Sequence, residues 1–227
     1  MKPLYISLVC LLFVFSCKSE KKKNNQVDPK KELAIEEKIA NAHGYEVWKN
    51  VEKVTFTFKV DTDKIKGNGR SWVWFPKNDS VYMKAGGLEV KYSRQNLDSV
   101  PANADKAFIN DKFWLLVPFQ LIWDSTATIS EAKKVESPIH KEELDMITIT
   151  YPLEGGYTPG DAYDIYFDEN YLIKEWSYRK GNSPEPSLSN TFENYKDFNG
   201  IKIAMDHKKD SGNQWNLNFT DVSVTLE

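Results

Sequence analysis

The sequence predicts an α+β domain built mainly from antiparallel β-strands. Short runs of residues alternate between apolar and polar with a period of two, as half-buried strands do. Tight-turn residues such as Gly86-Gly87 and Asn199-Gly200 separate neighbouring runs. One dense apolar stretch over 108–123 interrupts this pattern. Together these observations indicate about ten or eleven strands and two or three helices in a single domain.

The first elements after residue 32 change from a helical period to a strand period. Apolar side chains recur every three to four residues over 33–43, which predicts a helix that Gly44 ends or kinks. Val54 to Val60 then alternate as a half-buried strand does. Return strands are expected over 71–76, 81–84 and 88–92, the first with Trp72 and Trp74 on one face.

Residues 108–123, FINDKFWLLVPFQLIW, are the densest apolar stretch after the N-terminus. Asp111 is the expected N-cap of a short helix through Leu116, which Pro118 stops. Residues 119–123 then continue as a buried loop or a second short helix. The stretch is too short and too interrupted to cross a membrane, so we expect it to cover the concave face of the sheet.

Strand patterns resume after this stretch and continue to the end of the chain. Asp168-Glu169-Asn170 and Asn199-Gly200 have the residues that hairpin turns need. Pro and Ser over 181–189 indicate one loop. The expected strands span 128–135, 144–151, 162–167, 171–179, 191–198, 201–208 and 215–226.

Composition and charge exclude several classes of protein. With 227 residues, 41% hydrophobic and 13% aromatic, the chain is too apolar to be disordered. Residues 33–227 contain 23 basic and 30 acidic residues, a net charge of −7, which argues against nucleic-acid binding. Cys10 and Cys17 are the only cysteines, so 33–227 has no disulfide, thiolate metal site or cysteine nucleophile.

The N-terminal residues predict export and membrane attachment. Residues 1–16 have a positive start at Lys2 and an apolar segment of signal-peptide length. Val14 to Cys17 resemble the lipobox of bacterial lipoproteins, which implies cleavage before Cys17 and lipidation of this residue. Residues 17–32, polar and rich in lysine, would then be a flexible tether, and 33–227 a single domain. An ordinary cleaved signal or an uncleaved anchor are the alternatives.

The sequence contains no catalytic or metal-binding motif, so we expect no enzyme activity and no cofactor. His43, His140 and His207 are isolated from one another; we expect the first at a helix end and the other two on the surface. Asp61 and Asp63 share one face of a strand, where two like charges indicate a solvated strand end rather than a metal site.

Aromatic residues are the remaining functional signal. An open, curved sheet leaves an apolar concavity that either packs against its cover or holds an apolar ligand. Trp and Phe can line such a space with few hydrogen-bond partners. The candidate ligand-lining residues are Trp72, Trp74, Phe113, Trp114, Phe119, Trp123 and Trp176.

The order of elements resembles a known superfamily. The helix ending in AHGYEVWKNV, the apolar stretch between two groups of strands, the turn around Asp168 and the segment 195–203, YKDFNGIKI, carry the resemblance. Together they resemble the LolA and LolB lipoprotein carriers and related lipoproteins of Bacteroidetes. The resemblance implies a strongly curved antiparallel sheet, an open half-barrel, with helices covering its concave face.

Two functions are consistent with this resemblance. The first is a lipoprotein anchored to the membrane and facing the periplasm, in the outer membrane rather than the inner, that binds a lipid, an acyl chain or another apolar ligand. Surface exposure stays open, although the lysines after Cys17 favour the periplasmic side. The alternative is an interaction or structural protein whose half-barrel is packed shut and docks a protein partner of unknown identity.

Overall fold

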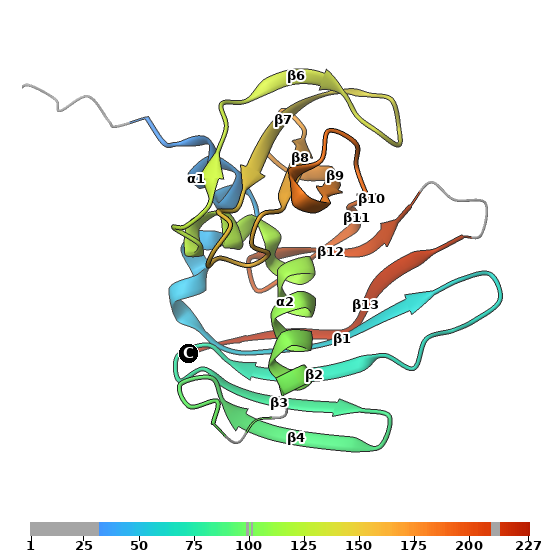
Figure 1. The fold of residues 1–227 in the computed structure, drawn as a ribbon. Helices are drawn as coiled ribbons and strands as arrows, with labels where there is room; N and C mark the ends of the chain where they lie inside the picture. Colours follow the sequence, from blue (N-terminus) through green and yellow to red (C-terminus); the bar gives the residue numbers. More distant parts are fainter. Residues whose placement is uncertain (1–31, 99, 101, 210–213) are drawn as a thin grey trace, which may run out of the picture. The chain divides into compact units, whose positions relative to one another are not determined.

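Thirteen strands in the described part of the chain form two antiparallel sheets (Figure 1). The computed structural model describes residues 32–98, 100, 102–209 and 214–227. The predicted signal peptide, Cys17 and nearly all of the tether lie outside the described residues. The first sheet contains, in hydrogen-bonded order, β11 (Glu193–Phe198), β12 (Ile201–Lys208), β13 (Asn216–Leu226), β1 (Val51–Asp61), β2 (Arg70–Phe75), β3 (Ser80–Ala85) and β4 (Leu88–Ser93).

The second sheet is smaller and open as well. Its order is β10 (Leu188–Thr191), β9 (Ile173–Arg179), β8 (Ala162–Phe167), β7 (Glu143–Thr150) and β5 (Thr128–Ile129), with β6 (Lys133–Glu136) also pairing with β7. Neither sheet closes into a barrel within the described residues. The predicted α+β class with antiparallel strands is confirmed.

The arrangement differs from the prediction in the number of sheets and strands. The predicted strand 128–135 is two strands, because residues 130–132 leave the ladder between β5 and β6. The predicted strand 191–198 begins earlier, as β10, and the chain then passes from the second sheet to the first at Phe192. The backbone N–H of Phe192 still bonds to Lys174 O on the second sheet, whereas Glu193 pairs with Asp206 on the first.

Side chains join the two sheets where β10 lies beside β12. The Lys208 backbone N–H donates to Thr191 Oγ1 at 3.0 Å, and Asn190 Nδ2 donates to the His207 carbonyl at 3.3 Å. These bonds replace the backbone ladder that would make one continuous sheet. We call this junction, formed by residues 190–191 and 207–208, the seam.

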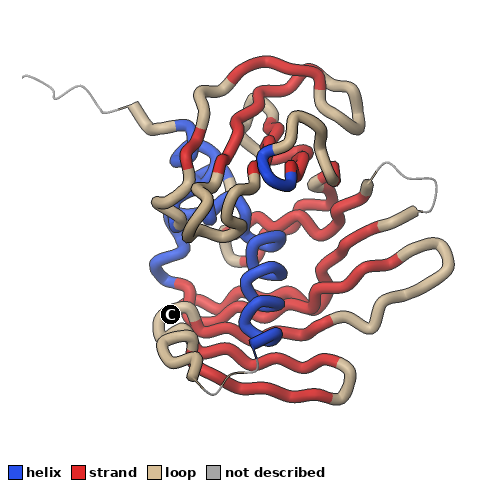
Figure 2. Tube along the Cα trace, in the orientation of Figure 1, coloured by secondary structure: helices blue, strands red, loops and turns tan. Residues whose placement is uncertain are grey.

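The described chain contains three short helical segments and one long helix: α1 (Ile35–Ala42), η1 (Tyr45–Asn50), α2 (Ala102–Trp123) and η2 (Lys180–Asn182), drawn in Figure 2. The long α2 starts nine residues before Asp111, so the prediction of Asp111 as an N-cap is wrong. A kink at Leu116, two residues before Pro118, divides α2 and leaves a second short helical part after it. The kink is where the sequence places the end of the first helix.

Apolar residues surround α2 on nearly every side, because the helix packs against both sheets. Phe108 contacts Trp72 and Trp74 of β2, with ring centroids 5.4 and 5.6 Å apart. Further along the helix, Trp114 contacts Trp176 of β9 at 4.3 Å. A helix that is apolar all round belongs in an interior, and Figure 1 shows α2 crossing the strands of the first sheet. No helix among the described residues is long and apolar enough to span a membrane.

Candidate ligand-binding cavity

A cavity of about 260 Å³ lies between α2 and the second sheet. Two of its lining residues come from α2, two from the loop between β7 and β8, and the rest from β8, β9 and β10. They are Asn110, Trp114, Tyr157, Thr158, Tyr163, Trp176, Tyr178 and Leu188. None of these side chains is charged at neutral pH, so the cavity offers aromatic faces and a few hydroxyl and amide groups.

Ring contacts fix the walls of this cavity. Tyr157 stacks on Phe113 of α2 with centroids 3.8 Å apart and an interplanar angle of 5°. Tyr163 contacts Trp176 at 5.2 Å, and Trp176 contacts Trp114 at 4.3 Å with a steep tilt of 65°. Such offset and edge-to-face contacts stabilise aromatic clusters beyond their area burial, so the walls are held from both α2 and the sheet.

The tyrosine hydroxyl groups are neutral and bonded at the cavity rim. The Tyr157 hydroxyl donates to Asn110 Oδ1 at 3.3 Å, and the Tyr178 hydroxyl donates to Asp161 Oδ2 at 2.8 Å. Burial, with a smaller contribution from the hydrogen bond to Asp161, raises the pKa of Tyr178 to about 12. Burial also raises the pKa of Tyr157 well above its usual value. The rim therefore carries no tyrosinate charge near neutral pH.

Three buried polar atoms of the described structure have no hydrogen-bond partner: Trp176 Nε1, Asn190 Oδ1 and His207 Nε2. Their residues are at most 1% exposed. We call them the polar trio. Buried polar atoms are nearly always hydrogen-bonded, so three unpartnered atoms, one of them on the cavity-lining Trp176, require a physical explanation.

His207 is the predicted surface histidine that the structure places in the core, so that prediction is wrong. Its exposed fraction is zero, and burial lowers its pKa to about 4. A carbonyl can only accept, so the 3.3 Å contact between Nδ1 and Leu217 O places the proton on Nδ1. Nε2 is then an acceptor. Its position could be found from the strand period, because Ile203, Met205 and His207 are in phase on β12.

The other two histidines follow the predictions. His43 lies at the end of α1, with Nδ1 donating to Ile39 O at 2.8 Å, but it is buried and burial lowers its pKa to about 4. His140 is on the surface, its side chain 47% exposed. No group of three potential metal ligands occurs in the part of the chain that the structure describes.

The seven predicted ligand-lining residues separate into two groups. Trp114 and Trp176 line the cavity, and Phe113 stacks behind its Tyr157 wall. The others pack elsewhere in the core, where Trp48 contacts three of them: Trp74, Phe119 and Trp123, with ring centroids 4.9–5.5 Å apart. Trp72 packs on α2, and its indole N–H donates to Asp111 Oδ2 at 2.9 Å.

Sequence reasoning missed most of the cavity wall. Tyr163 of β8 pairs directly with Tyr178 of β9. The alternation of residues along these two strands was the sequence signal that could have placed both side chains on the cavity face. Tyr157 and Thr158 come from the loop after β7, and Leu188 from the start of β10. No sequence pattern marks these three as neighbours of Trp176.

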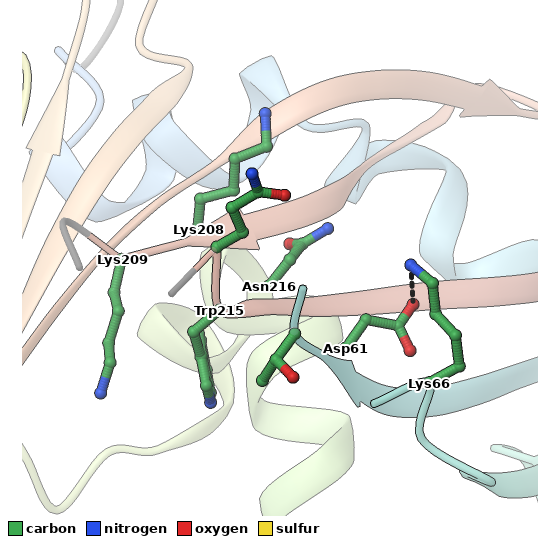
Figure 3. A pocket seen from close by; sticks show the side chains of 8 residues that line it. Asp61, Lys66, Lys208, Lys209, Trp215 and Asn216 are labelled. Atoms are coloured by element: carbon green, nitrogen blue, oxygen red, sulfur yellow. Dashed lines mark ion pairs between the residues drawn. The ribbon is translucent and has the colours of Figure 1, made fainter. Parts of the chain in front are cut away.

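A second pocket, of about 380 Å³, lies where β1 and β12 end and β13 begins (Figure 3). Its character is polar: Asp61 lies 3.9 Å from Lys66 and 3.2 Å from Lys59. Although burial opposes the shift, hydrogen bonds from the Gly67 N–H and the Asn218 amide lower the pKa of Asp61. Three lysines, Lys66, Lys208 and Lys209, line this pocket together with Asp61. Such a charged lining suits an apolar ligand less well than the aromatic cavity does.

Comparisons with known proteins give similarities in structure only. No family model matches the sequence, and no curated protein matches it. A LolA superfamily protein from Nitrosomonas europaea has a TM-score of 0.44 and 12% identity, over 86% of this chain and 96% of that one. A DUF1329 family protein from Desulfovibrio piger has a TM-score of 0.43 and 10% identity, over 84% and 91%. TM-scores below 0.5 assign neither fold nor function, so the function must be argued from the residues of this chain.

Proposed function

We propose that the protein binds a small apolar or amphipathic molecule in the cavity between α2 and the second sheet, without catalysing a reaction. The observation that supports this proposal is the cavity wall, in which Trp114, Tyr157, Tyr163, Trp176 and Tyr178 surround an uncharged space. Apolar ligands bind in such spaces by removing their surface from water, at ~25 cal/mol per Å².

The cavity volume limits the size of the ligand. An engineered apolar cavity of roughly 150 Å³ holds benzene, which has six heavy atoms. In proportion, about 260 Å³ holds about ten heavy atoms. A complete membrane lipid is far larger, so the proposed ligand is a short chain, a small ring system or one end of a longer molecule.

The proposal places the protein in the cell envelope. A lipid on Cys17 would anchor it to a membrane on the periplasmic side, with 17–32 as the tether of the domain 33–227. Intact-mass measurement of the membrane fraction tests this part. The expected result is a chain that begins at Cys17 and carries acyl groups, whereas an unmodified Cys17 would reject it.

Equilibrium dialysis with naphthalene, which has ten heavy atoms, tests the binding. We expect one naphthalene per chain with a dissociation constant below about 1 mM, which corresponds to about −4 kcal/mol. Leu188→Trp should fill the cavity and reduce the affinity at least tenfold. Leu88→Trp is the matched control, because Leu88 lies on β4 with 54% exposure and far from the cavity wall; it should bind as the unmodified chain does.

A second candidate function is a packed structural or docking protein, favoured by one observation. Trp72, Trp74, Phe119 and Trp123 contact core residues and do not line the cavity. If a well-folded chain retains no naphthalene, or if Leu188→Trp and Leu88→Trp bind it equally, the apolar-binding proposal is rejected in favour of this candidate.

A further inference from the structure

We propose that the polar trio binds the head group of an amphipathic ligand whose apolar part occupies the cavity, and that this head is uncharged and has two hydrogen-bond donors and an acceptor. This inference rests on the proposed function and specifies its ligand class. The trio consists of Trp176 Nε1, Asn190 Oδ1 and His207 Nε2, all without a partner in the described structure.

The three side chains of the trio are neighbours inside the molecule. Asn190 pairs directly with Trp176 across β10 and β9, and directly paired residues project from the same face of a sheet. The Asn190 amide nitrogen donates to the carbonyl of His207 at 3.3 Å. The Phe192 ring contacts both other side chains of the trio, with ring centroids 5.6 Å from Trp176 and 4.5 Å from His207. The trio is therefore one site at the seam rather than three separate defects.

Trp176 connects this site to the cavity. Its indole lines the cavity while its Nε1 belongs to the trio. Trp114, the other large cavity residue, lies 4.3 Å from Trp176 and 5.6 Å from His207. A ligand seated against Trp114 and Trp176 thus has its polar end beside the seam.

The protonation of the trio defines the chemistry of the head group. Trp176 Nε1 is a donor only, and Asn190 Oδ1 is an acceptor only. His207 Nε2 is an acceptor because Nδ1 donates to Leu217 O. A complementary head accepts one hydrogen bond and donates two, as a vicinal diol or a primary amide does. A carboxylate offers no donor, and an ammonium group offers no acceptor to the indole.

Charge also argues against an ionic head. His207 is neutral at physiological pH, because its pKa is about 4. Its ring contacts, Trp114, Phe192 and Phe219, are aromatic and uncharged, and the carboxylates of Asp206 and Glu193 only partly oppose the effect of burial on its pKa. A buried charge without a counter-ion is strongly unfavourable, whereas a neutral head that satisfies the trio is favourable.

Three probes of ten heavy atoms separate tail binding from head binding. 1,2-Octanediol has two donors and acceptors, its isomer 1,2-dimethoxyhexane only accepts, and decane does neither. Each is measured by its displacement of naphthalene in equilibrium dialysis with the full chain. The informative quantity is the ratio of the diol affinity to the ether affinity, compared between variants, because differences in water solubility cancel.

Variants assign the effect to the trio. In Asn190→Leu we expect the diol-to-ether ratio to fall about tenfold, since one hydrogen bond to a buried group is lost. Asn218→Leu is the matched control: Asn218 is also buried, but its amide donates to Asp61 at 3.1 Å, and the ratio should stay unchanged. If circular dichroism shows that Asn190→Leu does not fold, His207→Phe, which removes the acceptor Nε2 and keeps an aromatic ring, gives the same readout.

The outcomes distinguish this inference from the proposed function. A ratio that is equal in the unmodified chain and in Asn190→Leu, with naphthalene still bound, overturns the head-group site and means that water serves the trio. Absence of binding by naphthalene, decane and the diol overturns the proposed function itself.

Discussion

Replacing Asp111 tests how α2 is held against the first sheet. Its carboxylate is fully buried and accepts hydrogen bonds from Arg70 Nε at 2.8 Å, Arg70 Nη2 at 2.6 Å, Trp72 Nε1 at 2.9 Å and Asn110 Nδ2 at 3.0 Å. The hydrogen bonds to Asp111 raise the pKa of Arg70. This bidentate pair links the middle of α2 to β2, and α2 in turn supplies two residues of the cavity wall.

The magnitude follows from what Asp111→Leu leaves behind. Breaking a buried ion pair by removing one partner costs about 3–5 kcal/mol. The side chain of Arg70 is 37% exposed and can regain water, which lowers the cost. The Trp72 indole N–H has no such access, because Trp72 is 1% exposed, and an unsatisfied buried donor costs about 1–3 kcal/mol. We therefore expect Asp111→Leu to lower the free energy of unfolding by about 3–4 kcal/mol.

Urea unfolding at pH 7, extrapolated to water, measures this loss. Arg70→Met and the double variant complete a cycle, in which the double variant should be at least about 2 kcal/mol more stable than the sum of the two losses predicts. Asp145→Leu is the control, because Asp145 pairs with Lys134 on the surface and should lose less than about 1 kcal/mol. Additive losses, or a loss below about 1 kcal/mol for Asp111→Leu, would refute the reasoning.

Two further predictions concern stability. Gly44 has φ +94°, and a Cβ there would overlap the carbonyl of Gly200, so Gly44→Ala should lose more than about 3 kcal/mol in urea unfolding; Gly86→Ala, with φ +56° and open space, should lose about 1 kcal/mol. Because the pKa values of buried His43 and His207 are about 4 rather than 6.5, the unfolded chain binds more protons between these values. Stability should be full above about pH 6.5 and fall toward pH 4 by up to about 3 kcal/mol per histidine. A fall that is equally large in His207→Leu would contradict the assignment to His207.

Alternation and turn chemistry predicted most strands, because both are local. The predicted strand 201–208 matches β12 (Ile201–Lys208), and the turn before it places Asn199 and Gly200 at positive φ, as a tight hairpin requires. The start of α2 was missed for a non-local reason. Asp111 is a good N-cap by residue type, but in the helix interior its carboxylate is bonded to Arg70, 41 residues away. No local pattern shows such a partner.

The candidate cavity was predicted by residue type but not by position. Trp114 and Trp176 were predicted to line an apolar space under the stretch 108–123, and both line the cavity. Tyr157 and Leu188 were missed, because which loop and which strand end meet α2 depends on the packing of the two sheets. The polar trio was missed for another reason. The alternation of a strand can indicate that its residues are buried, but only the three-dimensional structure shows that their polar atoms have no hydrogen-bond partner.

The seam explains why polar groups gather at this place in the interior. In a continuous sheet, backbone groups of β10 and β12 would bond to each other and leave apolar side chains inside. Here the side chains of Asn190 and Thr191 supply those bonds, so polar residues have to face the junction. The amide nitrogen of Asn190 donates to the His207 carbonyl, and the amide oxygen has no partner. This oxygen lies on the same face of the β10–β9 pair as the cavity-lining Trp176. A split between the sheets thus creates both the polar atoms and the aromatic space beside them, and a ligand that satisfies both would stabilise the junction that the backbone leaves unpaired.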